Sequence, residues 1–182
     1  MPKVFLDGKE MERAITRMGH EIIERNKGPE NLCLVGIQRG GVHLANRLAR
    51  VMGGTEPGRE IPVGSLDISF YRDDIHIRKS PAVSKTEIPF SVNGMVIVLV
   101  DDVFFTGRSI RAAMDAIMDM GRPSMIQLAV LVDRGHRELP IRADFVGRNI
   151  PTSIGERVEV LLKEDGHEDS VVLLAPEEMA KP

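Results

Sequence analysis

Two adjacent carboxylates, Asp101 and Asp102, follow an unbroken aliphatic run from Val96 to Val100 and precede the sequence Thr-Gly-Arg-Ser at positions 106–109. Such an aliphatic run predicts a strand that is buried on both faces. Behind the turn, helical spacing relates the apolar residues Ile110, Ala113, Met114 and Ile117. In an open parallel sheet, the turn from a strand of this kind into a helix is where ligands bind.

The order of chemical groups along this turn indicates which ligand it would suit. Ionised carboxylates only accept hydrogen bonds, so Asp101 and Asp102 suit sugar hydroxyls or a hydrated metal ion. Gly107 lets the backbone bend, the N–H groups at the helix start suit a phosphate, and Thr106 and Ser109 add hydroxyl donors. Carboxylates followed by a phosphate site describe a ribose 5-phosphate. The alternative is that the Asp pair only forms a turn and Ser109 caps the helix.

The segment Ile97–Ser109 resembles the thirteen-residue signature of type I phosphoribosyltransferases, enzymes that bind phosphoribosyl pyrophosphate (PRPP). Residues 16–28, 67–74 and 131–144 extend the resemblance to the PyrR family, whose members are bifunctional pyrimidine operon attenuators and uracil phosphoribosyltransferases. The resemblance covers roughly residues 12 to 160. It implies PRPP contacts from Ile97, Val98, Leu99, Val100, Asp101, Asp102, Val103, Phe104, Phe105, Thr106, Gly107, Arg108 and Ser109.

A second strand–turn–helix unit lies upstream. The apolar run at 32–37 predicts a core strand, and it leads through Gln38 into Arg39, Gly40 and Gly41 before a helical pattern begins. By resemblance this turn is the pyrophosphate loop, in which Arg39 and the amides of Gly40 and Gly41 hold the leaving diphosphate. Family members often carry a basic residue followed by Thr, Arg and Gly here, so the match is incomplete. The alternative is an ordinary tight turn.

A polar stretch separates the two units. Residues 63–71 alternate between polar and apolar, which predicts one arm of a hairpin. Residues 72–88 are mainly polar and charged, and a loop of that length is usually a lid or a disordered excursion. By resemblance it is the flexible loop that closes over PRPP, with Tyr71 and Arg72 at its base.

Residues 133–151 resemble the hood that covers the base in related enzymes. The resemblance implies that Phe145 stacks on the base, that the backbone of Val146 contacts its edge, and that Arg134 is a further base-edge contact. The alternative for Phe145 is a core position, because buried phenylalanine is common.

The resemblance also implies an RNA site formed by Thr16, Arg17, His20, Arg137, Arg142 and Arg148. The first three lie opposite an apolar stripe in a helix predicted to begin at Asp7, with Met11, Ile15, Met18 and Ile22 in the stripe. The net charge is −3, so any RNA site must be a local patch. The alternatives are a solvated helix face and arginines that pair with Glu138, Asp144 or a neighbouring subunit.

We therefore expect one α/β domain, residues 1–182, with a mainly parallel central sheet, a small hood at 133–151 and a flexible loop at 72–88. The implied reaction converts uracil and PRPP to UMP and diphosphate, with Asp101, Asp102 and Arg39 as catalytic residues. Mg²⁺ would bind mainly through PRPP, with no direct protein ligand.

The same resemblance implies UMP-dependent binding to the mRNA leader of pyrimidine genes, and a homo-oligomer, dimer or larger. Two alternatives are an RNA-binding attenuator with little catalysis and an enzyme that has lost RNA binding. No apolar run approaches a membrane span, and the single Cys33 excludes an intramolecular disulfide. We therefore expect a cytoplasmic protein that binds no membrane.

Overall fold

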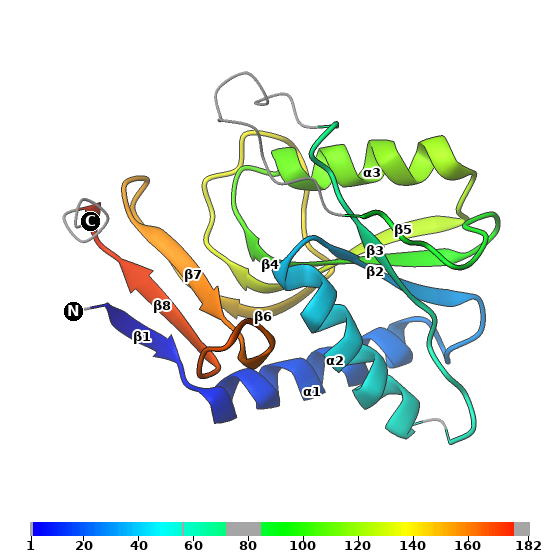
Figure 1. The fold of residues 1–182 in the computed structure, drawn as a ribbon, viewed down its shortest axis with the longest axis horizontal. Coiled ribbons are helices and arrows are strands. Elements are labelled where there is room, and N and C mark those ends of the chain that lie inside the picture. Colours follow the sequence, from blue (N-terminus) through cyan, green and yellow to red (C-terminus); the bar gives the residue numbers. More distant parts are fainter. Residues whose placement is uncertain (1, 56, 72–84, 177–182) are drawn as a thin grey trace.

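The computed structural model describes residues 2–55, 57–71 and 85–176 and contains two sheets (Figure 1). The elements are, in order, β1 (Lys3–Leu6), α1 (Gly8–Arg25), β2 (Leu32–Ile37), α2 (Gly40–Thr55), β3 (Val63–Leu66), β4 (Val96–Phe104), α3 (Arg108–Met120), β5 (Met125–Asp133), β6 (Phe145–Asn149), β7 (Arg157–Leu161), the 3-10 turn η2 (Lys163–Asp165) and β8 (Ser170–Leu174).

The larger sheet has the strand order β3-β2-β4-β5-β6, and every pair in it is parallel. Figure 1 shows α1 and α2 on one face of this sheet and α3 on the other. Two hydrophobic clusters fill the layers, one beneath α1 and α2 and one beneath α3. Because both faces are covered, β2 is buried along its whole length. The predicted α/β class with a mainly parallel sheet is confirmed.

The predicted first helix is confirmed and begins where expected. Asp7 is its N-cap and forms a capping box with Glu10: the Glu10 N–H donates to Asp7 Oδ1 at 2.8 Å, and the Asp7 N–H donates to Glu10 Oε2 at 3.0 Å. A cap of this kind stabilises a helix by about 1 kcal/mol. The apolar stripe is buried, as expected, and consists of Met11, Ile15, Met18 and Ile22.

The smaller sheet is antiparallel, with the order β1-β8-β7. The sequence runs at 157–162 and 171–174 predict two strands that pair as a hairpin, and β7 and β8 do so, with Arg157 opposite Leu174 and Leu161 opposite Ser170. This sheet stands beside the Asp102 end of β4, because β7 lines a cavity with Asp102 and Val103. Within the segment 133–151 expected to form the hood, Phe145–Asn149 instead form β6, the outermost strand of the parallel sheet, while Arg134 and Arg137 pack on the turn after β4.

The hairpin expected from residues 63–71 is also wrong. Only Val63–Leu66 form a strand, and it pairs in parallel with β2. A single antiparallel bridge joins Ser65 to Glu87, with both N–H···O distances at 2.8 Å. The alternating pattern is typical of a strand with one exposed face, but a hairpin also needs an antiparallel partner strand. Among the described residues, 85–88 contribute only the single bridge at Glu87. In the described part of the chain, no helix is long and apolar enough to span a membrane.

Candidate active site

The two strand–turn–helix units meet at adjacent strands, because β2 and β4 are neighbours in the sheet. A Cβ added at Gly40 would lie 2.6 Å from Asp102 Oδ2 and 3.2 Å from Asp102 Cβ, and one added at Gly41 would lie 2.2 Å from the Val100 carbonyl oxygen. Distances under about 3.0 Å are not found for real Cβ atoms, so only glycine permits this approach. The loop at 38–41 is therefore packed directly against the acidic pair.

The acidic pair lies where β4 extends beyond the end of its pairing with β2. Pairing with β2 ends at Val100, but pairing with β5 continues to Phe104. Asp101 and Asp102 are partly buried, and their carboxylates also accept backbone hydrogen bonds: Asp102 N–H to Asp101 Oδ1 at 2.9 Å, and Val103 N–H to Asp102 Oδ1 at 2.7 Å. Asp102 thus faces the loop at 38–41 with a carboxylate whose orientation is fixed.

The start of α3 is arranged as a phosphate site would require. Gly107 is the N-cap, with a left-handed φ of 94° and no side-chain cap. The alternative that Ser109 caps the helix is excluded, because Ser109 lies inside the first turn. The N–H groups of this turn, the positive end of the helix dipole and the partly buried hydroxyls of Thr106 and Ser109 are what an anion would meet.

Two arginines from the segment after β5 pack on the phenylalanines of this turn. The Arg134 guanidinium lies 4.0 Å from the ring centroid of Phe105, and the Arg137 guanidinium lies 3.4 Å from that of Phe104. Arg137 also forms an ion pair with Asp133 and donates from Nη1 to the Phe105 carbonyl at 2.6 Å. Arg137 therefore supports the turn from within the chain.

Arg134 is one of the buried charged residues, with 6% of its surface exposed. Its Nη2 donates to the Ser153 carbonyl at 3.0 Å and its Nε to Thr152 Oγ1 at 3.2 Å. Burial lowers its pKa, while the charge of Glu156 opposes that shift. Arg134 consequently joins the Phe105 turn to residues 152–156, the connection between β6 and β7.

The base contact expected of Phe145 is corrected by its position. Phe145 has 3% of its surface exposed, belongs to the cluster beneath α1 and lies 5.6 Å from the Arg25 guanidinium. The carbonyl of Val146 accepts a hydrogen bond from Arg17 at 3.1 Å.

Ile154, which was not identified from the sequence, exposes 76% of its surface in the connection between β6 and β7 that Arg134 contacts. The signal in the sequence was Ile154 itself, an isolated apolar residue between Thr152-Ser153 and Gly155 in a segment without periodicity.

A cavity of about 300 Å³ lies between Asp102, Val103 and the whole of β7. The acidic pair is therefore bordered by the loop at 38–41 on one side and by the smaller sheet on another.

The remaining expected site residues lie at the edges of this region. Arg39 is exposed in the loop at 38–41, and the Gln38–Arg39 peptide is cis. Tyr71 is partly exposed, and a hydrogen bond with Asp119 of α3 raises its pKa. Arg72 and most of the expected flexible loop lie outside the described residues.

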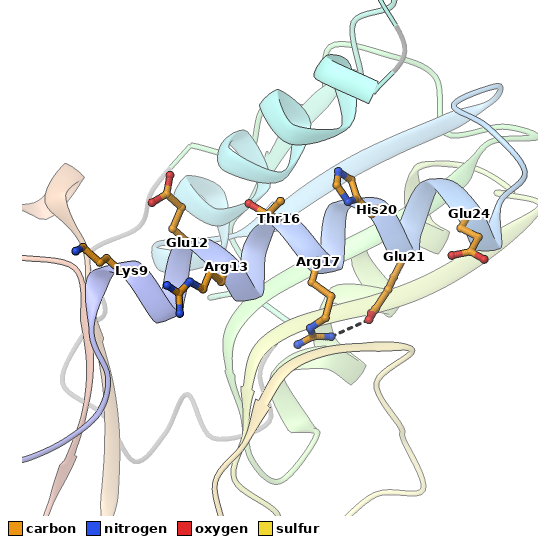
Figure 2. Close-up of a pocket in the computed structure, with 8 residues that line it drawn as sticks. All are labelled: Lys9, Glu12, Arg13, Thr16, Arg17, His20, Glu21 and Glu24. Atoms are coloured by element: carbon orange, nitrogen blue, oxygen red, sulfur yellow. Dashed lines mark hydrogen bonds and ion pairs between the residues drawn. The ribbon is translucent and has the colours of Figure 1, made fainter.

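The expected RNA residues do not form one free basic surface. Thr16, Arg17 and His20 of α1 line an open hollow of about 790 Å³. Figure 2 shows that Arg17 points away from Thr16 and His20. Arg17 turns away toward β6 and donates to the carbonyls of Val146, at 3.1 Å, and Gly147, at 2.6 Å.

Arg137 is likewise held internally, as described above. Arg142 and Arg148 are exposed, and neither side chain forms an ion pair or hydrogen bond with another described residue. Strand alternation puts Arg148 on the sheet face opposite α1, since Phe145 and Gly147 face that helix. Glu138 pairs with Arg108 at 2.7 Å and Asp144 with Arg25 at 3.1 Å, so neither acid neutralises the two exposed arginines.

Comparisons with known proteins agree with this geometry. Residues 3–164 match the sequence model of the phosphoribosyl transferase domain family. The chain is 60% identical over 171 residues to "Bifunctional protein PyrR" of Pelotomaculum thermopropionicum, covering 93% of this chain and 94% of that one. It is 57% identical over 175 residues to the protein of the same name from Listeria monocytogenes, covering 93% and 95%.

Solved structures of similar fold include a hypoxanthine phosphoribosyltransferase of Trypanosoma cruzi, with a TM-score of 0.76, 22% identity and coverage of 98% of this chain and 97% of that one. Another is a hypoxanthine phosphoribosyltransferase of Staphylococcus aureus, with a TM-score of 0.71, 18% identity and coverage of 96% and 93%. At such identities the likeness concerns the fold alone.

Proposed function

Because the chain belongs to the phosphoribosyltransferase family, and within it to the PyrR proteins, we propose that it transfers the phosphoribosyl group of PRPP to uracil. The observation that carries the proposal is the meeting of two turns: Gly40 touches Asp102, and the uncapped start of α3 follows a few residues later. Carboxylates for a ribose, a glycine loop for a diphosphate and amides for a 5-phosphate are thereby arranged around one position. The choice of uracil follows from the resemblance to the PyrR family.

In the proposed reaction, the bond from C1 of the ribose to the diphosphate oxygen breaks, and its electron pair leaves with the diphosphate. Asp101 and Asp102 hold the ribose hydroxyls and stabilise the positive charge that develops on the sugar. Arg39 and the amides of Gly40 and Gly41 hold the diphosphate. Uracil N1 then bonds to C1 and gives up its proton, which yields UMP. We assign no general base.

The acidic pair fits a role with Mg²⁺. Mg²⁺ is usually held by one or two carboxylates together with substrate phosphates and water, and Asp101 and Asp102 are adjacent, partly buried oxygen donors. Among the described residues, no group of three His, Cys, Asp or Glu side chains is placed to hold an ion. We therefore propose that Mg²⁺ binds mainly through PRPP, where it would neutralise charge on the diphosphate.

Arg134 is the proposed base-edge contact. Its guanidinium is anchored by Phe105, Thr152 and Ser153, so its direction is fixed before the base arrives. A preorganised donor loses less entropy on binding than a mobile one. We also propose a homo-oligomer, dimer or larger, which light scattering of the purified protein tests.

We further propose that the protein binds the leader of pyrimidine-gene mRNA and does so more tightly with UMP. Exposed Arg142 and Arg148 are available for phosphate contacts, and Arg142 shares a segment with Arg134 and Arg137, which pack on the turn proposed to hold the nucleotide. A second candidate is an enzyme that has lost RNA binding. The internal contacts of Arg17 and Arg137 favour it, because two of the six expected RNA residues are already engaged.

One preparation tests both halves. It is assayed with PRPP and Mg²⁺ for turnover of uracil, hypoxanthine or orotate, and then for binding of its own leader RNA with and without UMP across a salt series. We expect UMP formation, and RNA affinity that rises with UMP. The Arg142→Ala/Arg148→Ala variant should show a salt slope flatter by about one unit per lost phosphate contact, with UMP formation retained. Turnover of a purine but not uracil would refute the base assignment. If the protein binds its own leader RNA no more tightly than unrelated RNA, the regulatory part of the proposal is refuted and only the enzymatic part remains.

A further inference from the structure

Arg47 of α2 ties the turn between β7 and β8 to the body of the molecule. Its Nε donates to Glu164 at 2.9 Å, and its Nη1 and Nη2 donate to Asp169 at 2.9 and 2.8 Å. Only 16% of the Arg47 side chain and 9% of that of Asp169 are exposed. Asp169 also accepts the Lys163 N–H at 2.9 Å. One helical turn earlier, His43 Nε2 lies 3.4 Å from Asp165 Oδ1, so one face of α2 holds the whole turn.

The charges of this cluster are mutually stabilised. The hydrogen bond from Arg47 holds the pKa of Glu164 below its usual range. Burial alone would raise the pKa of Asp169, but hydrogen bonds from Arg47 and the Lys163 amide hold it below its ordinary value. The planar guanidinium reaches both carboxylates at once, which is the geometry in which a partly buried ion pair is strong.

Both structures that Arg47 joins, α2 and the β7–β8 hairpin, contact the candidate active site. α2 begins at Gly40, which touches Asp102. β7 lines the cavity of about 300 Å³ beside Asp102 and Val103 along its whole length, and it ends just before the turn that Arg47 holds. Arg47 thus joins α2, which contacts Asp102 through Gly40, to the hairpin whose first strand lines that cavity.

We propose that Arg47 is a positioning residue, which sets where the smaller sheet stands relative to the Asp102 end of β4. The proposal rests on the proposed function for its catalytic consequence. A displacement of about 1 Å at a reacting centre can cost as much as 10²-fold in rate, so a loosened hairpin should affect turnover more than it affects the stability of the parallel sheet.

The test compares Arg47→Met, Arg47→Lys and a matched control, Arg50→Met. Arg50 lies on the same helix and lines the same cleft of about 740 Å³ beside the hairpin, but it forms no ion pair with another described residue. Amide hydrogen exchange is measured in residues 158–174 and in β4 and β5. Steady-state kinetics with PRPP and uracil give kcat and KM separately.

In Arg47→Met we expect hairpin exchange at least tenfold faster with β4 and β5 unchanged, and kcat/KM about tenfold lower. For Arg47→Lys, both the hairpin exchange rate and kcat/KM should lie between those of Arg47→Met and the wild type. If Arg47→Met does not fold, Arg47→Lys alone provides the comparison. Hairpin exchange equal to that of Arg50→Met would overturn the proposal, as would a loosened hairpin with unchanged kcat and KM. A wild type that forms no UMP refutes the proposed function instead, and the exchange comparison then still decides whether Arg47 holds the hairpin.

Discussion

Replacing Gly40 by alanine tests whether the loop at 38–41 and the acidic pair act as one site. The added methyl group would lie 2.6 Å from Asp102 Oδ2, 3.1 Å from Cγ and 3.2 Å from Cβ, so rotating the carboxylate alone does not remove the contact. Rotation would also strain the 2.7 Å hydrogen bond from the Val103 N–H. The loop and Asp102 must therefore separate by several tenths of an ångström.

Overpacking of this kind costs about 1–3 kcal/mol of folding free energy, which a domain of ordinary stability tolerates. A displacement of about 1 Å at the reacting groups can cost 10²-fold in rate, so a displacement of several tenths of an ångström should lower kcat/KM for PRPP by about tenfold. UMP formation and thermal unfolding are measured on the same samples. In Gly41→Ala the obstacle is backbone, the Val100 carbonyl at 2.2 Å, so we expect loss of folded protein instead.

Gly54→Ala is the matched control, since it lies in the same helix with no atom within 4 Å of the added methyl. It should be neutral or stabilising by up to about 1 kcal/mol, with normal kinetics. A Gly40→Ala enzyme that unfolds slightly earlier yet turns over PRPP at the wild-type rate would show that the contact with Asp102 has no part in the reaction.

Three further predictions concern the charged groups. Changing Asp101 and Asp102 together to Asn keeps side-chain size but removes the charge, and should lower the rate of UMP formation by about 10²-fold or more; near-normal turnover by the folded double variant would make both residues turn formers only. Arg134→Gln should raise KM for uracil roughly tenfold with little change in KM for PRPP, because a charge-assisted hydrogen bond contributes about 1.5–3 kcal/mol; an equal effect on both substrates would contradict a base contact. Glu164 and Asp169 have pKa values lower in the folded than in the unfolded chain, so their stabilisation is present above the unfolded values and is lost as pH falls through the folded ones. Unfolding free energy should therefore drop below about pH 4, and the drop should be smaller in Asp169→Asn, as urea titrations at several pH values would show.

The elements that depend on local sequence were predicted, and those that depend on distant partners were not. β2 and β4 contain continuous apolar runs followed by glycine turns, so their existence and their place at the candidate site follow from the residues themselves. β4 nevertheless continues past the predicted end at Val100, through Asp101 and Asp102 to Phe104. β1 has only four residues, and its partner β8 lies at the other end of the chain. Without that partner nothing in Lys3–Leu6 indicates a strand, so the place of β1 beside β8 could not be foreseen.

Residues 133–151 show the same limit in the candidate site. Phe145 and Gly147 alternate with Val146 and Arg148, a pattern that fits any strand with one buried face. Which face is buried depends on α1, more than a hundred residues earlier, which packs against β6 and so takes Phe145 into the core. The connection from Ile150 to Glu156, which lacks periodicity, was passed over although Arg134 contacts it.

The arginines expected to bind RNA illustrate why a cation in a sequence is not yet a binding group. Arg17 and Arg137 each donate to backbone carbonyls of the chain, and a guanidinium with five N–H donors satisfies several acceptors at once. Those donors would have to give up bonds to carbonyl acceptors, some of them partly buried, in order to reach a phosphate, and a net hydrogen bond contributes about 0.5–1.5 kcal/mol. Arg142 and Arg148 face no such cost, because both are exposed and neither is engaged with another described residue. RNA affinity should therefore depend on Arg142 and Arg148 first, and Arg137 should affect it only by way of the turn at Phe104 and Phe105.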